Sequence, residues 1–168
     1  MTSAVIVSVR VEASAEEAFR AFTDDIGEWW RPSGLFALTP HGDGALYFEA
    51  GEGGRLMTRL PSGREFEIGK VLAWAPGALL RFSWRPASVA PDQATEVEVR
   101  FEPVGVETRV TVEHRGWDGV PQAHAARHGF PLGPFQARLA DHWRGQLRRL
   151  AENAQFLEKS IPAILRLS

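Results

Sequence analysis

The C-terminal part of the chain carries an amphipathic pattern that sets the size of the whole fold. Between Phe135 and Leu157, apolar residues recur at intervals of three or four, which places them on one face of a helix. This face consists of Phe135, Leu139, Trp143, Leu147, Leu150, Ala154 and Leu157. With a rise of about 1.5 Å per residue, the helix is about 35 Å long and can cross a small domain. Pro134 suits its first turn, and Pro162 cannot continue it.

The chain before this helix consists mainly of short alternating segments, which predict strands. Ala4–Glu12 is the first, and the capping-box pattern Ser14–Glu17 after it opens a short helix. A second short helix, Ile26–Trp30, ends before Pro32. Further strands, separated by glycine and proline turns, are expected at Ala45–Ala50, Arg55–Leu60, Glu65–Trp74, Leu79–Arg85, Thr95–Glu102 and Glu107–His114.

This order of elements predicts an α+β fold in a single domain of residues 1–168. An antiparallel sheet of six or seven strands must bury one face, and only the C-terminal helix is large enough to cover it. Residues 159–168 form a peripheral apolar tail with Ile161, Ile164 and Leu165. The tail packs either back on the domain or on another subunit, so a homodimer is one possible assembly.

Composition excludes several classes of partner and site. The chain has 168 residues, a formal net charge of -2 and no cysteine. This charge gives no reason to expect nucleic acid as a partner, and a thiolate metal site or a cysteine nucleophile is impossible. The N-terminus lacks the apolar core of a signal peptide, and no segment is long enough to insert into a membrane. We therefore expect a cytoplasmic protein, and no sequence motif calls for a cofactor.

Seven local motifs, in this order, resemble the SRPBCC or START-like superfamily. They are V-E-A-S-A-E-E-A-F-R-A-F-T at 11–23, W-W at 29–30, G-G-R-L at 53–56, G-K-V-L-A-W-A-P at 69–76, L-L-R-F-S-W-R-P at 79–86, T-R-V-T-V-E-H-R-G-W at 108–117 and H-W at 142–143. The branch they resemble most is the homologues of the heat-shock-protein-90 ATPase activator. This resemblance implies a helix-grip fold, a curved antiparallel sheet wrapped around the C-terminal helix with a cavity between them. Relatives include ligand carriers, polyketide cyclases and aromatases, and co-chaperones, so the fold alone does not give the activity.

Strand phase predicts which side chains face the helix. Alternation places three residues of each of three strands on the inward face. They are Leu80, Phe82 and Trp84, then Val97, Val99 and Phe101, and then Val110, Val112 and His114. From these strands, the neighbouring tryptophans and the helix we predict an apolar, aromatic ligand wall. Its residues are Trp74, Phe82, Trp84, Val99, Phe101, Val112, His114, Trp117, Leu139 and Trp143. The alternative is that these side chains simply fill the core.

His114 is the candidate catalytic residue. Alternation puts it on the buried face of its strand, where a neutral imidazole could bind a ligand oxygen or act as a general base. The structural alternative is a histidine paired with a backbone carbonyl or with Trp117.

Other polar residues give weaker signals. His124 and His128 have a helical spacing that zinc can use, but no third ligand is evident, so we predict no metal. Arg55 either anchors an anionic head group at the cavity mouth or lies on the solvated sheet face paired with a carboxylate. The alternation of its strand does not show which face of the sheet Tyr47 lies on.

Three functions remain open from the sequence. The first is binding of a small hydrophobic, ring-containing molecule between sheet and helix. The second is an enzyme of the cyclase, aromatase or hydrolase kind that uses His114. The third is a co-chaperone that activates a heat-shock ATPase.

Overall fold

The computed structural model describes residues 4–32, 35, 38–85, 95–120, 127 and 129–160, with side chains up to residue 154. In chain order its elements are β1 Ala4–Val11, α1 Ala15–Asp24, α2 Ile26–Trp29, β2 Ala45–Phe48, β3 Arg55–Arg59, β4 Glu65–Ala75, β5 Leu79–Trp84, β6 Thr95–Val104, β7 Glu107–Arg115, the 3-10 turn η2 Trp117–Gly119 and α3 Leu132–Ser160. The expected α+β helix-grip fold is confirmed. The apolar tail beyond Ser160 lies outside the described residues.

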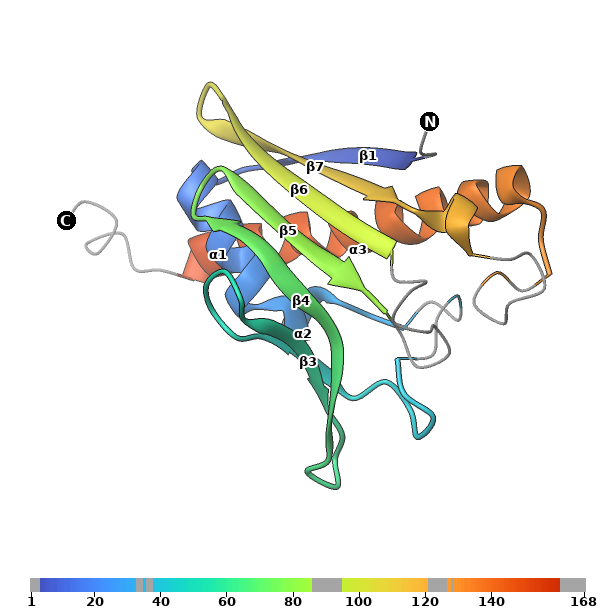
Figure 1. Cartoon of the computed structure of the whole chain (residues 1–168). Coiled ribbons are helices and arrows are strands. Elements are labelled where there is room, and N and C mark those ends of the chain that lie inside the picture. Colours follow the sequence, from blue (N-terminus) through green and yellow to red (C-terminus); the bar gives the residue numbers. More distant parts are fainter. Residues whose placement is uncertain are drawn as a thin grey trace.

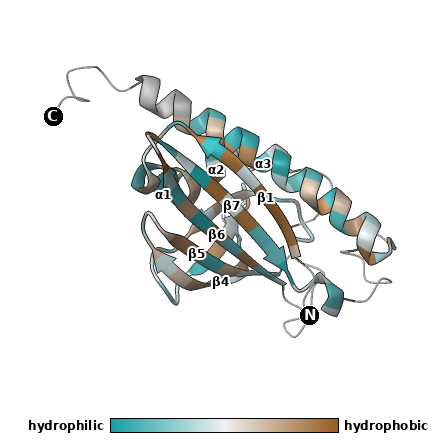
Figure 2. Cartoon of the chain, turned by 90° about the horizontal axis from the view of Figure 1, so that it is seen from above, coloured by the Kyte–Doolittle hydropathy of each residue, from teal (hydrophilic) through white to brown (hydrophobic). Residues whose placement is uncertain are grey.

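The seven strands form one antiparallel sheet in the order β1-β7-β6-β5-β4-β3-β2. The sheet curls, and α1, α2 and α3 lie on its concave side (Figure 1). Because β1 pairs with β7, the first strand of the chain lies beside the last. This pairing brings β1 next to α3, which packs against it (Figure 2).

Alternation along the strands separates the core from solvent, and hydrophobic and hydrophilic residues alternate along them in Figure 2. On β5, Leu80, Phe82 and Trp84 are all buried. The inward residues expected on β6 and β7 are also buried: Val97, Val99, Phe101, Val110, Val112 and His114. The predicted phase of these three strands is therefore confirmed.

The long helix begins at Leu132, three residues before the expected start at Phe135. Its first turn contains Pro134, which is tolerated because first-turn N–H groups have no partner inside a helix. The predicted apolar face is buried from Phe135 to Ala154. At the other end of the chain, Ser14 caps α1 by accepting a hydrogen bond from the Glu17 amide at 3.1 Å.

Two close backbone contacts shape the sheet around the helices. Gly69 lies on β4 between two register shifts, and a Cβ there would lie 1.7 Å from the Ser83 carbonyl oxygen. Only glycine therefore fits where β4 bends across β5. Gly27 of α2 similarly faces the Leu46 carbonyl of β2, at 3.1 Å from a would-be Cβ. At this second contact α2 lies against β2, the edge strand of the sheet.

Candidate functional site

Polar and aromatic side chains gather where β5 ends and β6 begins. The sheet register pairs Trp84 with Thr95 and Val97 with His114, so these residues lie on adjoining strands. From the opposite side, α3 brings Trp143 onto the same point.

A chain of hydrogen bonds joins α3 to three strands in this region. The Trp143 indole N–H donates to His114 Nδ1 at 3.1 Å. The other ring nitrogen, Nε2, lies 2.7 Å from Thr95 Oγ1. Thr95 in turn donates its hydroxyl to the Trp84 carbonyl at 3.2 Å. Because Nδ1 accepts and the Thr95 hydroxyl is already used as a donor, the proton of the neutral imidazole resides on Nε2.

His114 is consequently a neutral, fully engaged histidine. Burial, followed by the nearby His142, lowers its pKa to about 3. Its hydrogen-bond partners are Thr95 and Trp143, and its ring also contacts that of Trp117, with the centroids 5.5 Å apart. To act as a general base, the ring would have to release the Trp143 N–H from Nδ1. The geometry thus favours a structural role and does not test the catalytic prediction.

Six rings surround this hydrogen-bond chain and form what we call the Trp–His cluster. Its members are Trp30, Trp84, His114, Trp117, His142 and Trp143. Trp30 contacts three of the other rings, with ring centroids 5.4 Å from Trp84, 5.2 Å from His142 and 5.6 Å from Trp143. Most of these pairs are tilted or edge-to-face, the arrangement that the aromatic quadrupole favours.

The ten predicted ligand residues lie in or against one hydrophobic core and occupy different parts of it. Trp84, His114, Trp117 and Trp143 belong to the Trp–His cluster. Three others lie in an aromatic group under α1, in which Phe19 contacts Trp74 and Phe101, and Phe48 contacts Trp74 and Phe82. Phe22 and Trp29 connect this group to the Trp–His cluster, through ring contacts from Phe101 to Trp30. The remaining three, Val99, Val112 and Leu139, are fully buried. Only Trp74 is partly exposed, so these side chains now fill the interior against one another.

Sequence reasoning missed several residues of the Trp–His region. Trp30 and His142 were visible only within the W-W and H-W motifs, with no role assigned. Thr95 is in phase with Val97, which was a usable sign that it faces inward. Gln146 falls beside the apolar stripe of α3, where a polar residue signals a specific partner.

Gln146 fixes the end of α2 to α3. Its side chain is fully buried, accepts a hydrogen bond from the Arg31 amide at 3.0 Å and donates one to the Arg31 carbonyl. Its Oε1 also accepts a hydrogen bond from Arg149 Nη2 at 3.0 Å. One amide side chain therefore holds both a backbone segment and a guanidinium.

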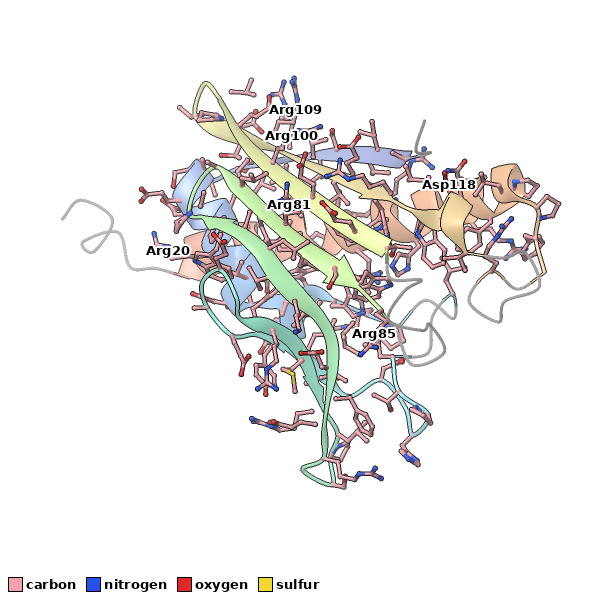
Figure 3. All side chains as sticks on the ribbon, in the orientation of Figure 1. Arg20, Arg81, Arg85, Arg100, Arg109 and Asp118 are labelled. Atoms are coloured by element: carbon pink, nitrogen blue, oxygen red, sulfur yellow. The ribbon has the colours of Figure 1, made fainter. Side chains whose placement is uncertain are left out.

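Charged residues on the convex face of the sheet pair with one another. Arg81, Arg100 and Arg115 extend from neighbouring strands, and Figure 3 labels the first two. Their carboxylate partners are Glu96, Glu98, Glu102 and Glu113. These three arginines and four glutamates form a half-exposed network of ion pairs.

Arg55, the residue that the sequence offered as an anchor for an anionic head group, forms a two-pronged pair with Glu49 at 2.7 and 2.8 Å. It is exposed, which confirms the solvated alternative for this residue. Tyr47 lies with its ring 5.2 Å from the Arg59 guanidinium.

Metal-binding residues do not cluster in the part of the chain that the structure describes, since no group of three or more His, Asp or Glu side chains there is placed to hold an ion. His124 and His128 lie outside the described residues.

Two hollows lined by described residues lie at the surface. The larger, about 940 Å³, is bounded by residues 41–47 and 59–61. The smaller, about 310 Å³, lies between β1 and α3. None of the ten predicted ligand residues lines either hollow. Among the described helices, none is both long and apolar enough to cross a bilayer.

Comparison with known proteins gives the family. Residues 12–155 match the activator of Hsp90 ATPase homolog 1-like proteins. The chain belongs to this family. The predicted branch of the SRPBCC superfamily is thereby confirmed. No curated protein sequence matches the chain.

Solved structures of several other proteins share this fold. Protein MLL2253 from Mesorhizobium loti is 20% identical, with a TM-score of 0.60 over 95% of this chain and 100% of that one. The Aha1 dimer from Colwellia psychrerythraea is 20% identical, with a TM-score of 0.58 over 89% and 94%. DynU16, from the dynemicin biosynthetic locus, is 23% identical, with a TM-score of 0.62 over 95% of this chain and 48% of DynU16. At these identities the likeness establishes the fold alone.

Proposed function

We propose that this protein binds a small hydrophobic, ring-containing molecule between the sheet and α3, at the Trp–His cluster. The observation that carries the proposal is the concentration of four tryptophan and two histidine rings around a single hydrogen-bond chain. Binding sites for small molecules typically combine apolar and aromatic walls with a few placed polar groups. Such rings offer flat surfaces for another ring.

Binding at this site requires some of the rings to move, because they now contact one another. We expect Trp30 to be the ring that moves, because it joins α2 to the cluster and is the most exposed tryptophan there. Its exposed fraction is 9%, against 1% for Trp84, Trp117 and Trp143. A ligand ring would then replace the contacts that Trp30 makes with Trp84 and Trp143. We further propose that the protein acts in the cytoplasm.

Catalysis by His114 of a cyclase, aromatase or hydrolase reaction is the second candidate. It is supported by the position of this titratable ring inside the cluster and by the likeness to DynU16, from a biosynthetic locus. The third candidate is activation of a heat-shock ATPase, supported by the name of the family. A change in ATP turnover when the protein is mixed with such an ATPase would favour the third candidate over the first.

Native mass spectrometry of the freshly purified protein tests the first candidate. We expect an organic adduct that is lost on denaturation and regained when the refolded protein is exposed to a solvent extract of the original preparation. Refolding without the extract is the control and should give the bare mass. A bare mass at every step would contradict ligand carriage and leave catalysis or a protein partner.

A further inference from the structure

Two arginines lie side by side where α2 meets α3, next to the outer edge of the Trp–His cluster. The edge is formed by Trp30 and His142, which at 9% and 8% are its most exposed members. Arg31 directly follows Trp30 and donates from Nη1 to the Trp30 carbonyl at 3.0 Å. Arg149 reaches the same place from α3 through Gln146, whose Oε1 also accepts from the Arg31 amide.

The charges of this arginine pair are not neutralised in the described part of the chain. Arg31 and Arg149 form no ion pair there, whereas the arginines that do are Arg10, Arg55, Arg59, Arg81, Arg85, Arg100, Arg115 and Arg144. The charged groups that act on Arg149 are Arg31, Arg148 and Glu152, so positive charge predominates. Placing like charges together is unfavourable unless something else at the site compensates.

Burial and a neighbouring arginine charge lower the pKa of both Arg149 and His142. Burial, and then the charge of Arg31, lowers the pKa of Arg149. Burial, and then the charge of Arg149, lowers the pKa of His142 to about 4. His142 therefore remains neutral near pH 7 and leaves the two guanidinium groups as the positive charges at this edge.

Arg149 is held in position but is not saturated with hydrogen bonds. Nη2 donates to Gln146, while Nε is buried without a hydrogen-bond partner among the described residues. A guanidinium has donors arranged to match two oxygens of a planar anion. The partial fixation of its side chain reduces the entropy lost when such an anion binds.

We infer that the ligand of the Trp–His cluster carries an anionic oxygen group, such as a carboxylate, which Arg31 and Arg149 bind while its ring lies against Trp84 and Trp143. This inference rests on the proposed function and names the class of its ligand, an aromatic acid. The arginine pair supplies the charge contact at the protein surface. The tryptophans supply the apolar contact beneath it.

A matched pair of fluorescent probes tests the inference. 1-Anilinonaphthalene-8-sulfonate and N-phenyl-1-naphthylamine have the same rings, and only the first carries an anionic group. We expect the protein to bind the anionic probe at least about tenfold more tightly than the neutral one, corresponding to one charge-assisted contact. Added sodium chloride should weaken binding of the anionic probe and leave the neutral probe unaffected.

Substitutions of the two arginines show whether they are the residues that bind the anionic group of the probe. Arg149→Gln and Arg31→Gln should each remove the preference for the anionic probe and leave the affinity for the neutral probe unchanged. Arg148→Gln is the matched control, because it removes the same charge from the exposed residue next to Arg149. This control should retain the preference. The salt dependence of the unmodified protein gives an independent reading if a variant fails to fold.

The possible failures are distinguishable. Equal affinity for both probes, unchanged by Arg149→Gln, would overturn the arginine pair as an anion site and leave the proposed apolar site intact. A preference that Arg148→Gln abolishes as strongly as Arg149→Gln would also overturn it, since it would reflect net charge. No binding of either probe would overturn the proposed function and the inference together.

Discussion

His114 has a hydrogen-bond partner on each ring nitrogen and contacts residues from distant parts of the chain. Strand alternation predicted that it is buried, because that depends only on its neighbours in sequence. Its partners could not be predicted in this way. Thr95 reaches it through the pairing of β6 with β7, and Trp143 through the docking of α3. Local patterns therefore locate a buried polar residue, and tertiary contacts decide what satisfies it.

Trp143→Phe tests how much the hydrogen bond between α3 and β7 contributes to stability. The substitution keeps an aromatic ring in the core but removes the N–H that His114 Nδ1 accepts. A buried acceptor left without a donor, together with the smaller ring, should lower the free energy of unfolding by about 2–4 kcal/mol. Urea unfolding followed by circular dichroism measures this.

A double-mutant cycle separates the hydrogen bond from the lost packing. We expect the combination of Trp143→Phe with His114→Leu to cost about 1–2 kcal/mol less than the sum of the single changes. Additive costs would mean that the 3.1 Å contact contributes no specific coupling energy.

At the scale of elements, β4 is the strand whose shape the pattern of apolar residues did not reveal. Its predicted extent, Glu65–Trp74, differs from the observed Glu65–Ala75 by one residue. The two register shifts along it were not predicted, because a bulge leaves little trace in alternation. Gly69 within the strand was the available signal, since glycine inside a strand often marks a close backbone approach.

Gly69→Ala should therefore strain the sheet. A methyl group cannot lie 1.7 Å from the Ser83 carbonyl oxygen, so β4 and β5 would have to separate. We expect a loss of about 3 kcal/mol or more in the free energy of unfolding, measured by urea titration.

Gly145→Ala is the matched control for this substitution. A Cβ at this helical position meets only the end of the Arg149 side chain, at 3.6 Å. Replacing glycine in a helix should stabilise the protein by about 0.5–1 kcal/mol. If both variants were stabilised alike, the close approach at Gly69 would not be limiting.

At the scale of the whole molecule, the sequence predicted the layers better than the interior. The amphipathic helix and the alternating strands establish one helical layer on one sheet, since each element has a single apolar face to bury. Most of the ten predicted ligand residues were chosen by the same rule, which gives the face of a strand that is buried but not which rings touch one another. The pairing of β1 with β7 was likewise not predicted, because alternation along a strand does not show which strands pair.

The interior of the molecule also determines how its stability responds to acid. Burial lowers the pKa of His114 to about 3 and that of His142 to about 4, whereas a histidine in an unfolded chain has a pKa of about 6.5. Between these values the unfolded chain binds protons that the folded protein does not. The free energy of unfolding must therefore be highest above pH 6.5 and fall as the pH drops toward 4.

Each buried histidine should contribute a slope of up to about 1.4 kcal/mol per pH unit in this range. Urea unfolding at intervals between pH 7 and pH 5 measures the slope. This range lies above the acidic titration of Glu49 and Glu65, whose pKa values Arg55 and Arg59 lower. His142→Gln removes one of the two groups and should reduce the slope by about half. An unchanged slope in this variant would mean that His142 does not stay neutral in the folded protein, and the two guanidinium groups would then share their edge of the cluster with a third cation.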